Sequence, residues 1–271
     1  MASNPYWSPK LEVVVVPSRD EVGPVVAAAV VALFQSKSKP VLGLATGSSP
    51  LPVYEELIRL HRADVWGVGQ GVCFLLDEYL GLVPEHPGLY RAYIREVLTD
   101  RVGLPTQHLF GPEVHREDLT RACRDYEQEI RAYGGVDLQI LGIGSDGHIG
   151  FNEPMSSLAS RTRIKTLTEQ TRLDNARSFG GDLDAVPRHV ITQGIGTILE
   201  AEHLVLVATG QGKADCVAKA LEGPVSAMVP ASVLQFHPHV TVVLDEPAAC
   251  KLALREYHKY TCEHKPSWQG L

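Results

Sequence analysis

Four short apolar runs of this 271-residue chain each end in a cluster of residues that can do chemistry. Hydroxyls and backbone amides can bind an anion, carboxylates beside an imidazole can move protons, and a lysine can pair with a phosphate. If the runs are parallel strands, their carboxyl ends lie at one edge of the sheet and the clusters converge on one crevice. The clusters are Thr46-Gly47-Ser48-Ser49, Asp77-Glu78-Tyr79, Gly144-Ser145-Asp146-Gly147-His148 and Thr209-Gly210-Gln211-Gly212-Lys213.

The hydroxyl-rich cluster after Leu44 leads into a helix predicted to begin near Pro50. Amides at a helix N-terminus together with hydroxyl side chains form an anion site, and phosphate is its usual occupant. The same residues also suit a plain capped helix start, so this segment alone leaves both interpretations open. Lys213, in a Gly-rich turn after another run, adds a cation and favours phosphate. The chain has no GxxxxGK[ST] string, so the segment is not a nucleotide P-loop.

A second cluster places Asp146, His148 and Glu153 within eight residues of one another. A tight turn can bring both carboxylates around the imidazole. A carboxylate on one ring nitrogen fixes the tautomer and raises the basicity of the other nitrogen, which makes a proton carrier near neutral pH. The alternative is a surface loop with unrelated charges, or a histidine bonded to a neighbouring carbonyl. The position directly after a buried run favours the functional interpretation.

Asp77 ends the apolar run 72–76, where partial burial of its carboxylate would raise its pKa. A carboxylate with a raised pKa suits a general base that removes a proton from a carbon next to a carbonyl. The alternative interpretation is an aspartate that caps the following turn.

Two further patterns carry less weight. Residues 142–147 match the GxGxxG string of dinucleotide sites, but the Gly and Pro residues that follow disfavour the helix that would hold a pyrophosphate. His237 and His239 flank a proline without a third ligand at suitable spacing, and we expect them to be ordinary surface residues. We therefore expect neither a metal nor a cofactor.

The composition is that of a folded, enzyme-sized protein, with 44% hydrophobic and 21% charged residues. A formal charge of −7 offers no basic field for nucleic acid or for an anionic membrane. The five cysteines form no CxxC pair and are expected to be reduced thiols. Neither a leader sequence nor an apolar stretch of membrane-spanning length is found, so we expect a cytoplasmic protein.

Strand-like and helix-like segments alternate along the chain and predict an α/β fold with a mainly parallel sheet and helices on both faces. We expect one catalytic domain at 11–271 behind an N-terminal extension at 1–10, with the weakly periodic stretch 150–186 as a lid. The predicted strands are 11–16, 41–44, 72–76, 138–143, 204–208 and 240–244. The predicted helices are 20–36, 50–62, 88–98, 117–133, 187–200, 212–221 and 248–260.

Four separated motifs, LGLATGSSP, FLLDEYLGL, GIGSDGHIGFNEP and SRTRIKTLT, occur in an order that resembles the glucosamine-6-phosphate deaminase family. The resemblance covers nearly the whole chain from about residue 11. It implies a Rossmann-like sheet and a cytosolic, usually hexameric enzyme of amino-sugar catabolism. Such an enzyme converts glucosamine 6-phosphate and water into fructose 6-phosphate and ammonia, with no metal or redox cofactor.

The resemblance also implies roles for individual residues. Asp77 would move a proton between C2 and C1 of the opened sugar, and His148 would open the pyranose ring. Asp146 and Glu153 would orient His148 and tune its charge. The implied contacts to the substrate phosphate are Thr46, Gly47, Ser48, Ser49, Arg177 and Lys213.

The family has an allosteric pocket for N-acetylglucosamine 6-phosphate between subunits, whose motif residues correspond here to Ser156, Arg163, Lys165 and Thr166. Two basic residues at alternate positions can clamp a phosphate. The alternative is a solvated basic strand. The extra residues before LEVVVV and the tail around Tyr257 and Tyr260 depart from the family pattern, so activation stays open.

Two other functions fit part of the pattern. A 6-phosphogluconolactonase has a similar fold, phosphate loop and DGH-like string, but the residues Asn152-Glu153-Pro154 and the DEY string favour the deaminase. A sugar-phosphate sensor would keep the pocket without the chemistry. The complete set of Asp77, Asp146, His148 and Glu153 argues against a sensor.

Overall fold

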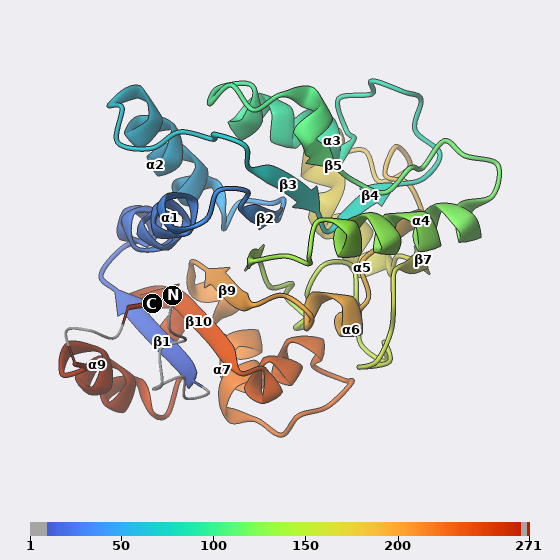
Figure 1. Cartoon of the computed structure of the whole chain (residues 1–271). Helices are drawn as coiled ribbons and strands as arrows, with labels where there is room; N and C mark the ends of the chain where they lie inside the picture. The colour runs from blue at the N-terminus through green and yellow to red at the C-terminus, as the bar shows by residue number, and fades with distance from the viewer. Residues whose placement is uncertain (1–9, 267–269) are drawn as a thin grey trace.

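All six predicted apolar runs form strands of one seven-stranded sheet in the computed structural model, which describes residues 10–266 and 270–271 (Figure 1). Neighbouring strands pair in parallel in the order β1-β10-β9-β6-β2-β3-β5. Most of the expected extension at 1–10 lies outside the described residues. The strands are β1 (Lys10–Val16), β2 (Val41–Leu44), β3 (Val72–Leu75), β5 (Leu109–Phe110), β6 (Leu138–Leu141), β9 (His203–Ala208) and β10 (His239–Asp245).

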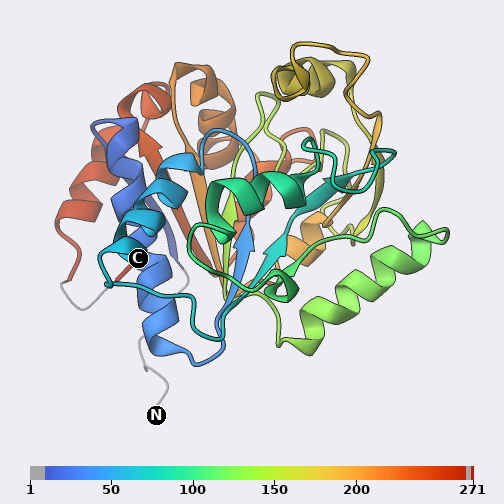
Figure 2. The ribbon, with the colours of Figure 1, turned by 90° about the horizontal axis from the view of Figure 1, so that it is seen from above.

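Strands β2, β3, β6 and β9 are buried along their whole length, which explains why their sequences are continuously apolar. Helices α1 and α4 lie on opposite sides of these central strands (Figures 1 and 2). The helices are α1 (Arg19–Ser36), α2 (Leu51–Arg62), α3 (Tyr90–Ile94) with a π-helical turn (Arg95–Thr99), α4 (Leu119–Ala132), α5 (Glu169–Asn175), α6 (Ile195–Ile198), α7 (Ala214–Glu222), α8 (Glu246–Ala249) and α9 (Arg255–Glu263). The predicted mainly parallel α/β architecture is therefore confirmed.

β2 and β6 are parallel neighbours at the centre of the sheet, and the order in which the chain adds further strands reverses between them. From β2 the chain proceeds outward through β3 to β5, whereas from β6 it proceeds the other way to β9 and β10. The loops after β2 and β6 consequently diverge and leave a crevice at their carboxyl ends. The hydroxyl cluster follows β2 and the histidine cluster follows β6.

A second sheet, which the sequence analysis did not predict, contains β4 (Asp77–Tyr79), β8 (His189–Thr192) and β7 (Arg163–Thr166) in antiparallel order β4-β8-β7. Only Leu76 separates β3 from β4. Asp77 therefore stands where the chain leaves the large sheet and enters the small one.

Two predicted helices were wrong in extent. The stretch 187–200 begins with β8, because its β-branched residues pair with both β4 and β7, and only Ile195–Ile198 is helical. The stretch 248–260 is divided between α8 and α9. Glu222 accepts hydrogen bonds from the backbone N–H groups of Ala253 and Leu254, which fixes the start of α9.

The buried apolar residues of the segment 150–186 form a small hydrophobic core together with Tyr79 and Val190, whereas Leu158 packs against the main core. With α5 the segment projects away from the large sheet in Figure 2. Its motion as a lid stays a prediction. The residues of the small core are Tyr79, Phe151, Leu167, Ala176, Val186 and Val190.

The thiols of all five cysteines, each within the described residues, are free. Three of them, Cys73, Cys123 and Cys216, are buried. Among the described helices, none is both long and apolar enough to cross a membrane.

Candidate active site

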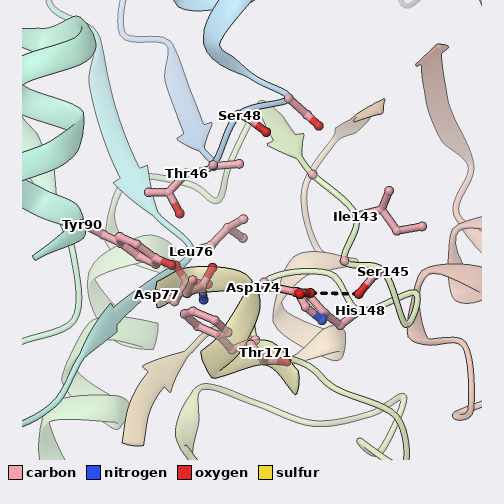
Figure 3. A pocket seen from close by; sticks show the side chains of 18 of the residues that line it. Thr46, Ser48, Leu76, Asp77, Tyr90, Ile143, Ser145, His148, Thr171 and Asp174 are labelled. Carbon is pink, nitrogen blue, oxygen red and sulfur yellow. Dashed lines mark hydrogen bonds between the residues drawn. The ribbon is translucent and has the colours of Figure 1, made fainter. Parts of the chain in front are cut away.

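A cavity of about 290 Å³ lies at the carboxyl ends of β2, β3 and β6 (Figure 3). It brings together residues from all the clusters that the sequence analysis singled out. Every residue predicted to contact the substrate phosphate lines it, and so do two of the four predicted catalytic residues. These lining residues are Thr46, Gly47, Ser48, Ser49, Asp77, His148, Arg177 and Lys213.

One end of the cavity is built to hold an anion. Helix α2 begins after Pro50 without a side-chain cap, so the hydroxyls of the preceding loop do not serve as the helix cap. Gly47 adopts a φ of +98°, which opens the loop toward the cavity in a conformation that other residues avoid. Lys213, at the start of α7, donates from Nζ to the carbonyl of Ile143 at 2.7 Å. Amides, hydroxyls and the cations Lys213 and Arg177 thus line the cavity and can hold an anion.

Asp77 is buried at 5% exposure, and no described residue donates a hydrogen bond to its carboxylate. Burial and the adjacent charge of Glu78 raise its pKa well above the usual value. The predicted upward shift is confirmed. The turn-capping alternative is not observed, because a capping aspartate would accept a backbone N–H.

His148 and Asp146 meet as the sequence predicts. Nδ1 of His148 lies 2.7 Å from Oδ1 of Asp146 in an ion-pair contact, and the same oxygen accepts a hydrogen bond from the backbone N–H of His148 at 3.1 Å. Although burial opposes it, the contact with His148 lowers the pKa of Asp146. A β-carbon on Gly144 would lie 2.2 Å from Cε1 of His148, so the imidazole fits only against glycine. The loop after β6 therefore forms a histidine site and not a helix for a dinucleotide.

Glu153 has a hydrogen-bond partner other than His148. Its buried carboxylate accepts hydrogen bonds from the backbone N–H of Thr168 at 2.9 Å and from its hydroxyl at 3.1 Å. Thr168 is the N-cap of α5, so Glu153 connects the histidine loop to the segment that carries Arg177.

The same loop passes close to Asp77. Gly150 has a φ of +54°, and a β-carbon there would lie 3.6 Å from Oδ2 of Asp77. The carboxylate of Asp77, on β4 of the small sheet, and the imidazole of His148, in the loop after β6 of the large sheet, consequently line one cavity.

Several pocket residues were not predicted from the sequence. Tyr90 comes from α3, and Thr171, Asp174 and Asn175 come from α5. Asp174 accepts a hydrogen bond from the hydroxyl of Ser145 at 3.0 Å, as Figure 3 shows. No motif marks these residues, because they reach the cavity from helices whose place depends on tertiary packing.

The residues predicted for an effector lie on and before β7. Nη1 of Arg163 donates to Oδ1 of Asn152 at 2.8 Å. Nη2 of Arg163 and Oγ of Ser156 are buried without a hydrogen-bond partner among the described residues. Lys165 lies on the same face of β7 as Arg163, whereas Thr166 points to the other face.

Asn152 joins this strand to the cavity. It is fully buried and donates from Nδ2 to the carbonyls of Ile149 at 3.0 Å and Gln193 at 2.8 Å. Ile149 follows His148, and the backbone N–H of Gln193 donates to the carbonyl of Leu76 at 2.7 Å. Arg163 is therefore connected to the segments that carry both His148 and Asp77.

The expectation of a surface role for the His-Pro-His segment was wrong for His237. Its side chain is buried, with Nδ1 2.9 Å from the carbonyl of His239 and Nε2 2.8 Å from that of Ala201. No group of three potential metal ligands occurs in the part of the chain that the structure describes.

Comparison with known proteins adds a family to this geometry. Residues 19–243 match the profile of the glucosamine-6-phosphate isomerases/6-phosphogluconolactonase family. The chain is 56% identical over 261 residues to a glucosamine-6-phosphate deaminase of Streptomyces coelicolor, which covers 96% of this chain and 100% of that relative. It is 55% identical, with the same coverage, to a glucosamine-6-phosphate deaminase of Mycolicibacterium smegmatis.

Solved structures agree with this result. A structure described as a monomeric glucosamine-6-phosphate deaminase aligns with a TM-score of 0.86 at 39% identity, over 89% of this chain and 100% of that one. A 6-phosphogluconolactonase from Thermotoga maritima aligns with a TM-score of 0.67 at 21% identity, over 87% of this chain and 99% of that one. The second likeness shows the fold alone.

Proposed function

The chain belongs to the glucosamine-6-phosphate isomerase and 6-phosphogluconolactonase family, and from this premise we propose that it converts glucosamine 6-phosphate and water into fructose 6-phosphate and ammonia. One observation carries the assignment of the site. The buried Asp77 carboxylate, with a raised pKa, shares a cavity with the His148–Asp146 pair and with two cations. Such a site suits proton transfer on a sugar phosphate.

The substrate phosphate is proposed to bind at the anion end of the cavity. The loop 46–49 supplies amides and hydroxyls at the start of α2, and Lys213 and Arg177 supply positive charge. Anchoring the phosphate on C6 leaves C1 and C2 to extend toward Asp77 and His148. Binding at a point remote from the reaction thus orients the reacting carbons.

Ring opening is proposed to fall to His148. With Nδ1 held by Asp146 at 2.7 Å, the imidazole presents Nε2 to the substrate. Nε2 can take the proton of the C1 hydroxyl and then deliver it to the ring oxygen as the bond between C1 and the ring oxygen breaks, which yields the open-chain aldehyde. The Asp146 carboxylate stabilises the charged imidazolium between the two steps.

Isomerisation is proposed to fall to Asp77. The ionised carboxylate removes the proton from C2 and returns it to C1, while the C1 oxygen gains a proton and the nitrogen loses one, so that C1 becomes an alcohol carbon and the amine-bearing C2 an imine. Water adds to that carbon, and the resulting carbinolamine expels ammonia and leaves the C2 ketone of fructose 6-phosphate. The raised pKa of Asp77 strengthens it as a base toward carbon.

The direct test is to assay release of ammonia and fructose 6-phosphate from glucosamine 6-phosphate by purified protein, without added metal. We expect both products in equal amounts. Hydrolysis of 6-phosphogluconolactone instead would support the lactonase alternative. Binding of the amino-sugar phosphate with neither reaction would support the sensor.

The quaternary structure, the effector and the cellular location are further proposals. Partnerless polar atoms on Arg163 and Ser156 support an anionic effector such as N-acetylglucosamine 6-phosphate. A hexamer follows from the family resemblance, but a related structure is described as monomeric. Sedimentation of the purified protein with and without N-acetylglucosamine 6-phosphate tests the number of subunits and whether the effector changes it. A substrate from central metabolism supports a cytoplasmic location.

A further inference from the structure

We propose that Glu78 is a positioning residue, which holds the proposed base Asp77 in register with the phosphate loop and supplies a negative charge beside it. The inference rests on the proposed function, since it takes Asp77 to act on a sugar phosphate. Glu78 adjoins Asp77 on β4 but does not line the cavity. It therefore acts through its neighbours and not on the substrate.

The Glu78 carboxylate is buried at 3% exposure and accepts hydrogen bonds from three backbone N–H groups. Oε1 accepts from Tyr79 at 2.9 Å and from Tyr90 at 2.8 Å, and Oε2 accepts from Arg91 at 2.9 Å. Tyr90 and Arg91 are the first residues of α3, whose own N-cap residue offers no side-chain cap. A glutamate from a distant strand thus satisfies the exposed donors at the start of this helix.

Helix α3 in turn supports the phosphate loop. The phenol of Tyr93 donates a hydrogen bond to the carbonyl of Gly47 at 3.3 Å. The side chain of Tyr90 lines the cavity on the same side as Thr46 and Asp77 (Figure 3). The contacts of Glu78 therefore join the strand that carries the base to the helix that supports the phosphate site.

This connection matters because the phosphate on C6 and the proton on C2 lie at a set separation in the substrate. A small displacement of α3 relative to β4 would change the distance between the phosphate loop and the base, which weakens substrate binding and moves the base off the C2 proton. Misplacement by about 1 Å costs on the order of a hundredfold in rate.

The charge of Glu78 has a second effect. The titratable groups around Asp77 are Glu78, the phenols of Tyr79, Tyr90 and Tyr126, and His148, which lines the same cavity. Burial raises the pKa of all three phenols, so they stay neutral. Burial also raises the pKa of Glu78, but the three N–H donors and Arg91 favour its ionised form. Glu78 is therefore the neighbour whose ionised form raises the pKa of Asp77 and strengthens it as a base.

The decisive variant is Glu78→Gln, assayed for kcat/KM on glucosamine 6-phosphate across pH. Removal of the charge eases ionisation of Asp77, so we expect the acid limb of the profile to shift to lower pH. We expect kcat/KM to fall about ten- to a hundredfold. The matched control is Glu113→Gln. Glu113 also contacts Arg91, at 3.7 Å, but is exposed, so neither its acid limb nor its kcat/KM should change.

A second variant separates the effect of the Glu78 charge from that of its side-chain length. Glu78→Asp keeps the charge but is too short for the N–H groups of α3, so we expect KM to rise while the acid limb stays in place. If Glu78→Gln does not fold, this split between KM and the pH profile carries the test. Loss of thermal stability with an unchanged acid limb and unchanged KM in the folded variants would overturn the proposal. Failure of the proposed function is distinguishable, because wild-type protein would then release no ammonia.

Discussion

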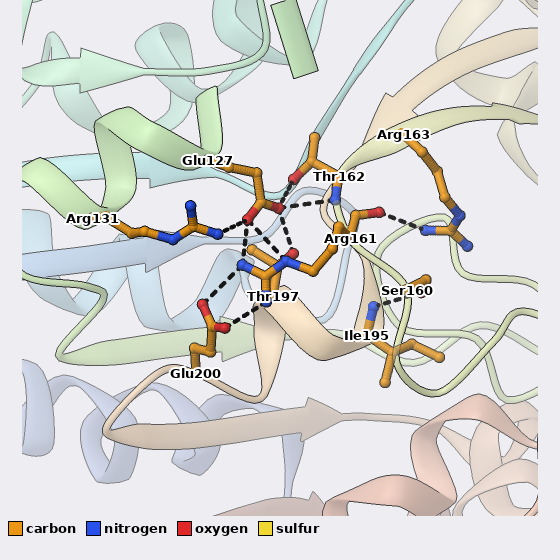
Figure 4. Close-up of polar contacts among 9 residues, drawn as sticks. All are labelled: Glu127, Arg131, Ser160, Arg161, Thr162, Arg163, Ile195, Thr197 and Glu200. Carbon is orange, nitrogen blue, oxygen red and sulfur yellow. Dashed lines mark hydrogen bonds and ion pairs between the residues drawn. The ribbon is translucent and has the colours of Figure 1, made fainter. Parts of the chain in front are cut away.

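Two buried carboxylates of this protein have opposite surroundings. Glu127 on α4 lies in a cluster of donors that is shown in Figure 4. It accepts hydrogen bonds from the backbone N–H and hydroxyl of Thr162 at 2.9 and 2.5 Å, from the hydroxyl of Thr197 at 2.5 Å, and from Arg161 and Arg131. Asp77 has no such donor among the described residues.

The pKa values of the two groups follow from this difference. Burial opposes ionisation of Glu127, but its hydrogen bonds from Thr162 and Thr197 outweigh burial and lower its pKa. Burial acts unopposed on Asp77 and raises its pKa. A buried carboxylate without donors is costly, and such costs concentrate at functional sites. Burial alone thus does not distinguish the two carboxylates, whereas the presence or absence of hydrogen-bond donors does.

The Glu127 cluster also holds residues 160–162, which lead into β7 of the small sheet. Arg161 spans Glu127 and Glu200, and the hydroxyl of Ser160 accepts a hydrogen bond from the backbone N–H of Ile195 at 3.0 Å. These contacts precede β7 directly. Residues 160–162 are therefore bound to α4 and α6, while Arg177, further along the same segment, lines the cavity.

The sharpest test of the comparison is Asp77→Asn. We expect kcat to fall by about a thousandfold or more, because the amide cannot remove a proton from carbon. The melting temperature should hold or rise, because an unpaired buried charge is removed. Steady-state kinetics and thermal unfolding on one preparation measure both. Marked destabilisation would show that Asp77 is structural and would end the contrast with Glu127.

A second test concerns His148→Gln, which leaves Asp77 in place. We expect about a hundredfold loss of turnover on the closed-ring substrate, because general acid–base assistance to ring opening is removed. Turnover of an open-chain analogue should change far less. Ammonia release measures both turnovers. Equal losses on the two substrates would contradict the ring-opening role.

The opposite outcome is expected for Glu127→Ala. Its removal leaves several buried donors without an acceptor, so the free energy of unfolding should fall by about 3 kcal/mol. Activity per folded molecule should remain within a few-fold of wild type. Denaturant unfolding measures the first and active-site titration the second. Glu129→Ala, an exposed glutamate on the same helix, is the matched control and should change neither.

The smallest expected effect is in the pH dependence of stability. The pKa of Glu127 lies below its ordinary 4.5, so its stabilisation is present above that pH and is lost as pH falls through the folded-state value. The pKa of Asp77 lies above its ordinary 3.8, so its charge destabilises the fold progressively as pH rises through the folded-state value. Stability curves of Glu127→Gln and Asp77→Asn should therefore deviate from wild type in opposite directions at neutral pH. Deviations of the same sign would refute the assignment.

Much of the site followed from local sequence. The hydroxyl loop at 46–49, Asp77 after its strand, and the Asp146–His148 pair were each predicted from residue type and position. They are local features, because each depends on a strand end or on a turn of a few residues. Glu153 is the counterexample, since its partner is Thr168 and not the nearby His148.

The sequence by itself determined the large parallel sheet and the edge at which its chemistry gathers, because apolar strands must be buried and their polar ends must meet. Only the tertiary structure decided the small sheet, the entry of α5 into the cavity and the donors of Glu78 and Glu127. Those features join residues far apart along the chain. Their hydrogen bonds depend on the path of the whole backbone and leave no periodic pattern in any one segment.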